Sequence, residues 1–207
     1  MKNLNLSLYL VASRGKKSDE AFLNCVKAAI LGGVSVVQLR EKELEAGEFF
    51  KLGLKLKKLC DELSTPLIIN DRIDLALALD AAGVHLGQED LPVSVARKIL
   101  GVDKIIGLSL KNLAQMQAGA DYLGCGALRA TPTKKSTILS LESLREIAKN
   151  SPLPVVAIGG IDEDVVASLR GLKLAGVAVV RAIMEAKNPR KSALRLKGAV
   201  CENLSLK

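Results

Sequence analysis

The strongest constraint on the fold is a regular alternation of short apolar segments with longer segments of helical periodicity. Each apolar segment is rich in Leu, Ile and Val and almost continuous, as expected of strands buried on both faces of a parallel sheet. Eight such strands are predicted, at residues 6–12, 34–39, 67–70, 84–86, 104–107, 122–124, 155–158 and 177–180. Between them lie amphipathic patterns such as residues 19–31 and 48–63, where apolar side chains recur every three or four positions.

Eight strands that are each followed by a helix predict an α/β fold of the TIM (β/α)8 barrel type, with residues 1–207 as a single domain. The chain is close to the lower limit of about 200 residues for this fold, so little room remains for a second domain. An open, doubly wound sheet is the alternative. Four glycines precede predicted strands, and we expect them to end the preceding helices: Gly32, Gly83, Gly119 and Gly176.

Composition excludes several other classes of protein. No segment approaches about 18 consecutive apolar residues and no secretory leader is visible, so we expect no membrane contact and a cytoplasmic location. The four cysteines form no CxxC pair and there is a single histidine, which argues against a disulfide framework or a soft-metal site.

The charge balance favours anionic partners. Lys and Arg number 30 against 22 Asp and Glu, a net charge of +8. With 3 Phe, 2 Tyr and no Trp, the chain offers almost nothing on which single-stranded bases could stack, so we expect no nucleic-acid partner. Small phosphorylated compounds are the expected partners instead.

Polar residues end the predicted strands, which is where TIM barrels carry their active sites. After the second strand, an extended chain with a period of two residues points Gln38, Arg40 and Lys42 to the same side. Two cations and an amide arranged in this way predict a clamp for a phosphate or diphosphate. The alternative is a charged surface turn.

Two carboxylates follow adjacent strands. Asp71 comes after the third strand, next to Asn70, and Asp90 lies in the loop after the fourth. Mg²⁺ prefers oxygen ligands and usually takes one or two carboxylates together with substrate phosphates, so this pair predicts a magnesium site. The alternative is that each Asp caps the next helix. His85 is expected to be a packed or hydrogen-bonded residue and not a base.

Two later loops predict phosphate binding. A long polar loop after the sixth strand contains Thr131, Thr133 and Lys134, a composition typical of a lid, with an ordinary flexible loop as the alternative. The seventh strand ends in Gly159-Gly160, followed by a predicted helix whose first N–H groups would face an anion.

Taken together, these segments resemble the thiamine-phosphate synthase family from about residue 6 to residue 195. The matching motifs occur in the family's order at five strand ends: Gln38-Leu39-Arg40-Glu41-Lys42, Asn70-Asp71-Arg72, His85-Leu86-Gly87-Gln88-Glu89-Asp90, Thr131-x-Thr133-Lys134-Lys135 and Ile158-Gly159-Gly160-Ile161. The resemblance implies a Mg²⁺-dependent transferase that joins hydroxymethylpyrimidine diphosphate to hydroxyethylthiazole phosphate, releases pyrophosphate and so serves thiamine biosynthesis. It also implies a dissociative reaction, in which pyrophosphate leaves before the thiazole nitrogen attacks.

The resemblance implies roles for individual residues. Mg²⁺ would be held by Asp71 and Asp90. The groups that would act in catalysis are Lys134, Ser109 and Arg40. The residues that would bind the pyrimidine diphosphate or the departing pyrophosphate are Gln38, Arg40, Lys42, Asn70, Ser109 and Lys134. Those that would bind the thiazole phosphate are Thr131, Thr133, Gly159 and Gly160. Val180 and Arg181, at the end of the predicted eighth strand, are further candidates for substrate binding.

Three positions depart from the family pattern: residues 127–130, where the family has Pro and an aromatic residue, Lys111 in place of a His, and Arg181 in place of a Ser. We expect Arg181 either to add a guanidinium to the phosphate site or to pair with an acidic residue on a neighbouring helix. Two other functions stay open: a thiazole tautomerase-like enzyme, and a catalytically silent phosphate-binding barrel that acts as a regulator. A homo-oligomer also stays open.

Overall fold

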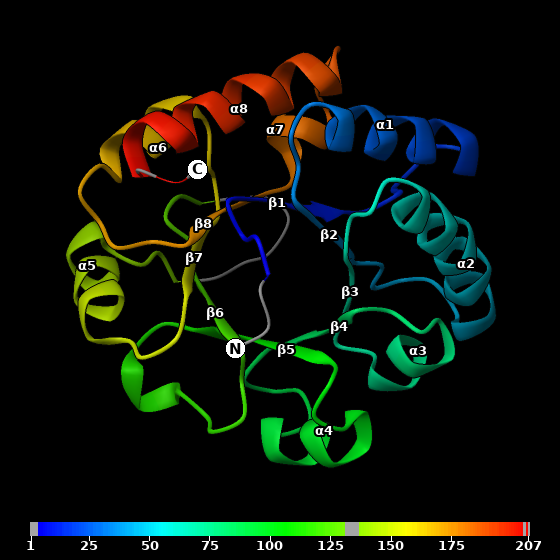
Figure 1. The fold of residues 1–207 in the computed structure, drawn as a ribbon, viewed down its shortest axis with the longest axis horizontal. Helices are drawn as coiled ribbons and strands as arrows, with labels where there is room; N and C mark the ends of the chain where they lie inside the picture. The colour runs from blue at the N-terminus through cyan, green and yellow to red at the C-terminus, as the bar shows by residue number, and fades with distance from the viewer. Residues whose placement is uncertain (1–3, 131–136, 205, 207) are drawn as a thin grey trace.

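In the computed structural model, which describes residues 4–130, 137–204 and 206, parallel strands form a closed barrel surrounded by helices (Figure 1). Strands that follow one another in sequence are neighbours in the barrel, and the last pairs with the first. The strands are β1 (Leu8–Ala12), β2 (Val36–Leu39), β3 (Leu67–Asn70), β4 (Gly83–Leu86), β5 (Ile105–Leu110), β6 (Tyr122–Gly126), β7 (Val155–Ile158) and β8 (Gly176–Val179). The predicted TIM barrel is confirmed.

Helices follow the strands and cover the outside of the barrel. They are α1 (Asp19–Leu31), α2 (Ala46–Glu62), α3 (Ile73–Ala78), α4 (Val93–Leu100), the 3₁₀ turn η1 (Leu113–Gln115), α5 (Leu141–Asn150), α6 (Glu163–Ser168), α7 (Arg181–Met184) and α8 (Pro189–Leu204). No helix in the described part of the chain combines the length and the apolar character that crossing a membrane requires.

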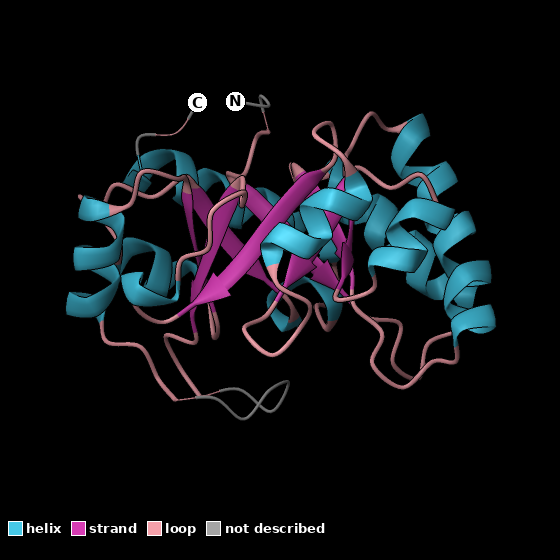
Figure 2. Cartoon of the chain, turned by 90° about the horizontal axis from the view of Figure 1, so that it is seen from below, coloured by secondary structure: helices cyan, strands magenta, loops and turns pink. Residues whose placement is uncertain are grey.

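Alternation along the strands creates two buried apolar layers. On β1, Tyr9 and Val11 belong to the set of side chains inside the barrel, whereas Leu8 and Leu10 belong to the larger set between strands and helices. That larger set includes Phe22 of α1, which is fully buried. Because neighbouring strands of the closed barrel are parallel, their carboxyl ends gather at one mouth, with the loops that follow them lower in Figure 2.

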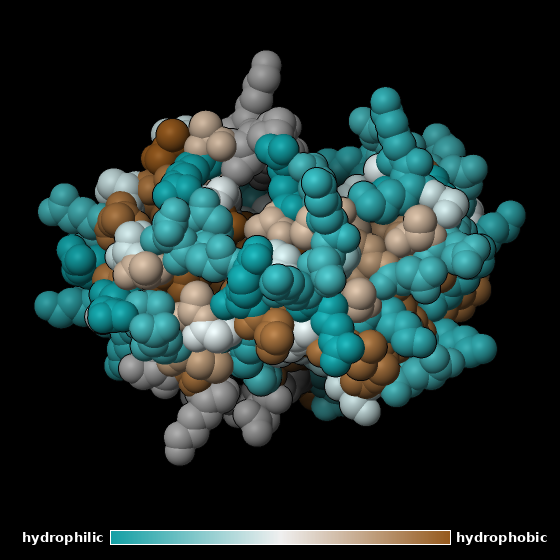
Figure 3. Space-filling view, turned by 90° about the horizontal axis from the view of Figure 1, so that it is seen from above, coloured by the Kyte–Doolittle hydropathy of each residue, from teal (hydrophilic) through white to brown (hydrophobic). Residues whose placement is uncertain are grey.

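The barrel closes where the two ends of the chain meet. Leu8 of β1 is aligned with Val177 of β8, and α8 packs against α1 outside this seam. The approach is so close that a Cβ on Gly32, at the end of α1, would overlap the backbone of Arg190. The outer face formed here by α6, α8 and α1 is mainly hydrophilic, with hydrophobic side chains in small separate spots (Figure 3).

Some predicted boundaries are wrong. The fifth strand runs to Leu110 and not to Gly107, and the eighth ends at Val179 and not at Val180. Gly32 does end α1, but Gly83 and Gly176 are the first residues of β4 and β8. A side chain at Gly83 would collide with the backbone of Ile105 in β5, and one at Gly176 with the backbone of Leu6, just before β1. Close approach of neighbouring backbone therefore explains both glycines.

Candidate active site

A cavity of about 830 Å³ opens at the carboxyl ends of the strands. Most of the residues singled out in the sequence line it: Gln38, Arg40, Lys42, Asn70, Asp71, Asp90, Ser109, Gly159, Gly160, Val180 and Arg181. Three others, Thr131, Thr133 and Lys134, lie outside the described residues, and their roles stay predictions.

The expected cationic clamp is formed by the end of β2 and the residues that follow it. Gln38 is buried within the strand, whereas Arg40 and Lys42 lie beyond its end. The backbone N–H of Arg40 donates to the carbonyl of Ala12 at 2.9 Å, which ties the start of this loop to β1. Lys42 Nζ lies 3.5 Å from Asp71 Oδ2, so the clamp adjoins the predicted metal site.

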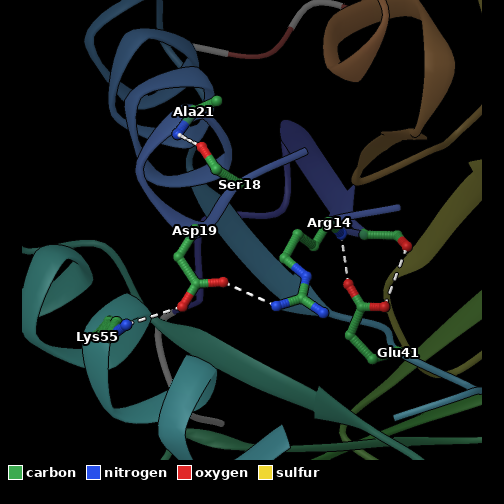
Figure 4. Close-up of polar contacts among 7 residues, drawn as sticks. Arg14, Ser18, Asp19, Ala21, Glu41 and Lys55 are labelled. Atoms are coloured by element: carbon green, nitrogen blue, oxygen red, sulfur yellow. Dashed lines mark hydrogen bonds and ion pairs between the residues drawn. The ribbon is translucent and has the colours of Figure 1, made fainter. Parts of the chain in front are cut away.

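Glu41, which lies between the two clamp residues in sequence, bonds to residues that follow β1 (Figure 4). Its carboxylate accepts a hydrogen bond from the backbone N–H of Arg14 and one of 3.4 Å from the Ser13 hydroxyl. The Arg14 guanidinium donates in turn to Asp19 at 2.8 Å, and Lys55 reaches the other oxygen of the same carboxylate at 2.8 Å. The loops after β1 and β2 are therefore joined by a polar contact that leaves Arg40 and Lys42 facing the cavity.

Asp71 and Asp90 are not helix caps, so the alternative interpretation of both residues is wrong. The cap position of α3 is Arg72 and that of α4 is Pro92, and neither helix has a side-chain cap. Asp71 adopts a left-handed φ of 62°, a conformation in which Asp is one of the better tolerated side chains. Asp90 accepts a hydrogen bond of 2.6 Å from the backbone N–H of Gly87 within its own loop.

The pKa of Asp71 reflects its surroundings in the cavity. Burial raises the pKa of Asp71, and the neighbouring carboxyl group of Asp90 raises it further, while Lys42 acts in the opposite direction. No group of three potential metal-binding His, Cys, Asp or Glu residues occurs in the described part of the chain. A pair of partly buried carboxylates fits Mg²⁺, which completes its shell with water and substrate phosphates, better than it fits a metal that needs a full protein cage.

A chain of buried hydrogen bonds crosses the floor of the cavity. The Gln38 amide nitrogen donates to the Tyr9 hydroxyl at 2.8 Å, and Tyr9 is 2.8 Å from the Tyr122 hydroxyl. Tyr122 is 2.9 Å from His85 Nδ1, and His85 Nε2 is 2.9 Å from the Ser109 hydroxyl. The expectation that His85 is a hydrogen-bonded residue is confirmed.

Sequence reasoning missed Tyr9 and Tyr122. The available signal was that these are the 2 tyrosines of the whole chain and that both fall inside predicted buried strands. A buried tyrosine needs a partner for its hydroxyl, so polar neighbours inside the barrel could have been expected. Which neighbours these are depends on strand register across the barrel.

The Gly159-Gly160 turn follows β7 directly, with φ values of 99° and 68° that favour glycine. The sequence predicted a helix directly after this turn, but α6 begins only at Glu163. Its first turn is capped by Asp162, which accepts from the backbone N–H of Val165 at 2.9 Å. The glycine turn itself lines the same cavity as the clamp residues.

Comparison with known proteins identifies the family. The family model described as thiamine monophosphate synthase matches residues 8–183. This chain belongs to that family. A thiamine-phosphate synthase of Campylobacter jejuni is 63% identical over 210 residues, covering 100% of both chains, and one from Methanobrevibacter smithii is 48% identical over 92% of this chain and 93% of its own. The solved thiamine phosphate pyrophosphorylase of Pyrococcus furiosus has a TM-score of 0.85 and 35% identity, covering 97% of this chain and 98% of its own.

These similarities make the chain a thiamine-phosphate synthase by function, a transferase of thiamine biosynthesis that acts on small phosphorylated substrates. They favour neither of the two other functions that the sequence left open. The three positions that depart from the family pattern all lie within the described residues, and the structure shows their neighbours.

Arg129, in the first departing segment, lies against the glycine turn. Its guanidinium pairs with Asp162 at 2.8 Å, and its backbone N–H donates to the Gly159 carbonyl at 3.1 Å. Lys111, in the second departure, is exposed, and its backbone N–H donates to the side chain of Gln115 at 2.7 Å. Arg129 therefore supports the turn from outside, while Lys111 follows the end of β5 and lines the cavity.

Arg181 does not directly follow the last strand, because β8 ends at Val179 and not at Val180. Arg181 is the first residue of α7, and its Nε donates to Glu185 on the same helix at 2.8 Å. Its side chain is half-exposed at the rim of the cavity. Val180, just before it, packs against the apolar side chains inside the barrel.

Proposed function

We propose that this chain joins hydroxymethylpyrimidine diphosphate to hydroxyethylthiazole phosphate with the help of Mg²⁺ held by Asp71 and Asp90. The observation that supports this most directly is that two carboxylates, neither of them a helix cap, meet beside a lysine at the mouth of the barrel. When bound, the metal would neutralise part of the charge on the diphosphate and on the departing pyrophosphate. The proposal includes a cytoplasmic location, whereas a homo-oligomer stays a prediction.

Arg40 and Lys42 are proposed to bind the diphosphate. A dissociative reaction places growing negative charge on the leaving group, so fixed cations stabilise the transition state more than the ground state. The contacts of Arg40 with β1 and of Glu41 with Arg14 hold the clamp loop before substrate arrives. Lys134, which is not among the described residues, is proposed to act on the same pyrophosphate.

Gln38, Asn70 and Ser109 are proposed to contact the pyrimidine end. Gln38 and Ser109 are the two ends of the hydrogen-bond chain that forms the floor of the cavity. Polar groups at the floor suit a heterocycle with nitrogen atoms, because a site that is built to hydrogen-bond a substrate rejects analogues without those groups.

The thiazole phosphate is proposed to bind on the side of the Gly159-Gly160 turn and Val180, with Thr131 and Thr133. Arg181 belongs to this set at the rim, where contact with a phosphate requires its guanidinium to leave Glu185. Backbone N–H groups of a glycine turn can approach a phosphate closely because no Cβ intervenes.

The test is Mg²⁺-dependent release of pyrophosphate from the two substrates by Asp71→Asn and Asp90→Asn. We expect turnover to fall on the order of a hundredfold or more in each, since the charge that holds the metal is lost while size is kept. Asp74→Asn is the matched control, because Asp74 lies on nearby α3 but pairs with Arg72 at the surface. Unchanged Mg²⁺ dependence in both site variants would contradict the proposal.

A further inference from the structure

In the hydrogen-bond chain on the cavity floor, the structure allows the donor of each bond to be assigned. It joins five side chains from five strands: Gln38 on β2, Tyr9 on β1, Tyr122 on β6, His85 on β4 and Ser109 on β5. Its ends are residues proposed to touch the pyrimidine diphosphate. The three side chains between them connect one end to the other.

Both tyrosines are neutral, because burial raises the pKa of each phenol well above its usual value. A neutral phenol has a single proton to donate. The Tyr9 oxygen receives a hydrogen bond from Gln38, so the proton of Tyr9 is free to point at Tyr122. If each hydroxyl proton takes part in one of these bonds, the proton of Tyr122 points at His85 Nδ1.

A neutral imidazole that accepts at Nδ1 carries its proton on Nε2. That proton is directed at the oxygen of Ser109, 2.9 Å away. Ser109 therefore accepts from His85 and keeps its own proton for the cavity. If the bonds ran the other way, Ser109 would donate its proton to His85 Nε2 and could only accept a hydrogen bond from a ligand.

We propose that this chain of hydrogen bonds fixes His85 as its Nε2–H tautomer and thereby makes Ser109 a hydrogen-bond donor to the substrate. Tyr9, Tyr122 and His85 are positioning residues for Ser109. The identity of the substrate rests on the proposed function, and the direction of the chain does not. A donor is what the substrate requires, because the oxygens of a diphosphate and the ring nitrogens of a pyrimidine accept hydrogen bonds.

Two glycines leave space for the side chains of this hydrogen-bond chain. A Cβ on Gly107 would lie 2.5 Å from His85 Nδ1 and overlap the Tyr122 hydroxyl, which is the contact that sets the tautomer. A Cβ on Gly124 would lie 3.0 Å from His85 Cε1. Two positions without side chains thus flank the imidazole on both of its hydrogen-bonded sides.

The first test reads the tautomer directly, because His85 is the 1 histidine of the chain and its imidazole nitrogens need no assignment. In ¹⁵N-histidine-labelled protein at about pH 9, we expect long-range ¹H–¹⁵N correlations of the Nε2–H form. Gln38→Glu replaces the donor by a carboxylate that only accepts, so each bond should reverse and the Nδ1–H form should appear. Ser109→Ala should leave the Nε2–H form, because Tyr122 still donates to Nδ1.

An Nδ1–H tautomer in the wild type overturns the proposal, as does a loss of the Nε2–H form in Ser109→Ala. If Gln38→Glu does not fold, those two measurements still decide. They need no catalytic turnover, so a wrong direction is distinguishable from a wrong assignment of the reaction.

The second test asks whether Tyr122 acts through Ser109. We expect Tyr122→Phe and Ser109→Ala each to lower kcat/KM for the pyrimidine diphosphate on the order of tenfold, and the double variant to be no worse than Ser109→Ala alone. Effects that multiply in the double variant would show that Tyr122 contributes only to packing. The value of KM for the thiazole phosphate should stay unchanged in all three.

Discussion

Gly107→Ala should destabilise the barrel because the space beside Gly107 is occupied by the hydrogen-bond chain. Gly107 is aligned with His85 of β4 on one side and with Tyr122 of β6 on the other. An added methyl group would fall inside van der Waals contact with the ring and hydroxyl of Tyr122 and 2.5 Å from His85 Nδ1. Tyr122 is 1% exposed, so its ring has nowhere to move.

Two contributions add to the cost. Forcing a methyl group into a packed interior costs about 3 kcal/mol at the upper end of the usual range. Displacing the hydrogen bond between Tyr122 and His85 costs about 1 kcal/mol more. A chain of this size loses about 2–4 °C of Tm per kcal/mol, so we expect Tm to fall by about 8–16 °C.

Two other glycines provide graded comparisons. A methyl group at Gly124 would meet His85 Cε1 at 3.0 Å, which needs a shift of a few tenths of an ångström, and we expect Gly124→Ala to lower Tm by only about 2–4 °C. Gly198 lies inside α8 with nothing within 4 Å, so Gly198→Ala should raise Tm by about 2–4 °C through helix propensity.

Thermal unfolding followed by circular dichroism measures all three values under one condition. The expected order of Tm is Gly198→Ala, wild type, Gly124→Ala and then Gly107→Ala. A Gly107→Ala protein as stable as the wild type would refute the packing of Tyr122 and His85 against the β5 backbone.

Further variants test the clamp, the carboxylates and the loops. Because folding raises the pKa of Asp71, the folded chain holds that proton more tightly than the unfolded chain and is destabilised as pH rises; Asp71→Asn should thus raise the metal-free Tm more at pH 8 than at pH 4, and an equal gain at both contradicts this. Glu41→Ala should raise KM for the pyrimidine diphosphate by about tenfold, since the clamp loop loses its support, with an unchanged thiazole KM as the internal control. Arg181→Ser should raise KM for the thiazole phosphate by about tenfold, less than a full charged hydrogen bond because the ion pair with Glu185 breaks first; an unaltered KM removes Arg181 from the site. Lys134→Ala should lower kcat more than it raises KM, and a change in KM alone would make the lysine a uniform binder.

The fold was predictable from the sequence where a strand is an uninterrupted apolar run. β3 and β7 begin and end at the predicted residues, because polar or glycine residues follow immediately. β5 was predicted too short, since Gly107 and Ser109 interrupt its pattern. Both interruptions come from the site: Gly107 leaves room for Tyr122, and Ser109 ends the hydrogen-bond chain.

The candidate site was predictable in part for a related reason. Residues at the carboxyl ends of the strands must meet at one mouth of the barrel, so Arg40, Asp71 and Asp90 could be grouped from their positions alone. The contact between Tyr9 and Tyr122 could not, because the two residues are 113 positions apart and face each other only once the barrel has closed. The position of Arg181 was not predicted, because β8 ends one residue earlier than expected and Arg181 is the first residue of α7.

The seam between β1 and β8 has a consequence for how the chain is made. β1 leaves the ribosome early but gains its second neighbour only when Val177 has been synthesised, and α1 gains its contact with α8 later still. At about 5–20 residues per second, that wait lasts roughly 8–35 seconds. Nascent chains that stall before α8 therefore leave the face of α1 that packs against α8 open to chaperones and proteases.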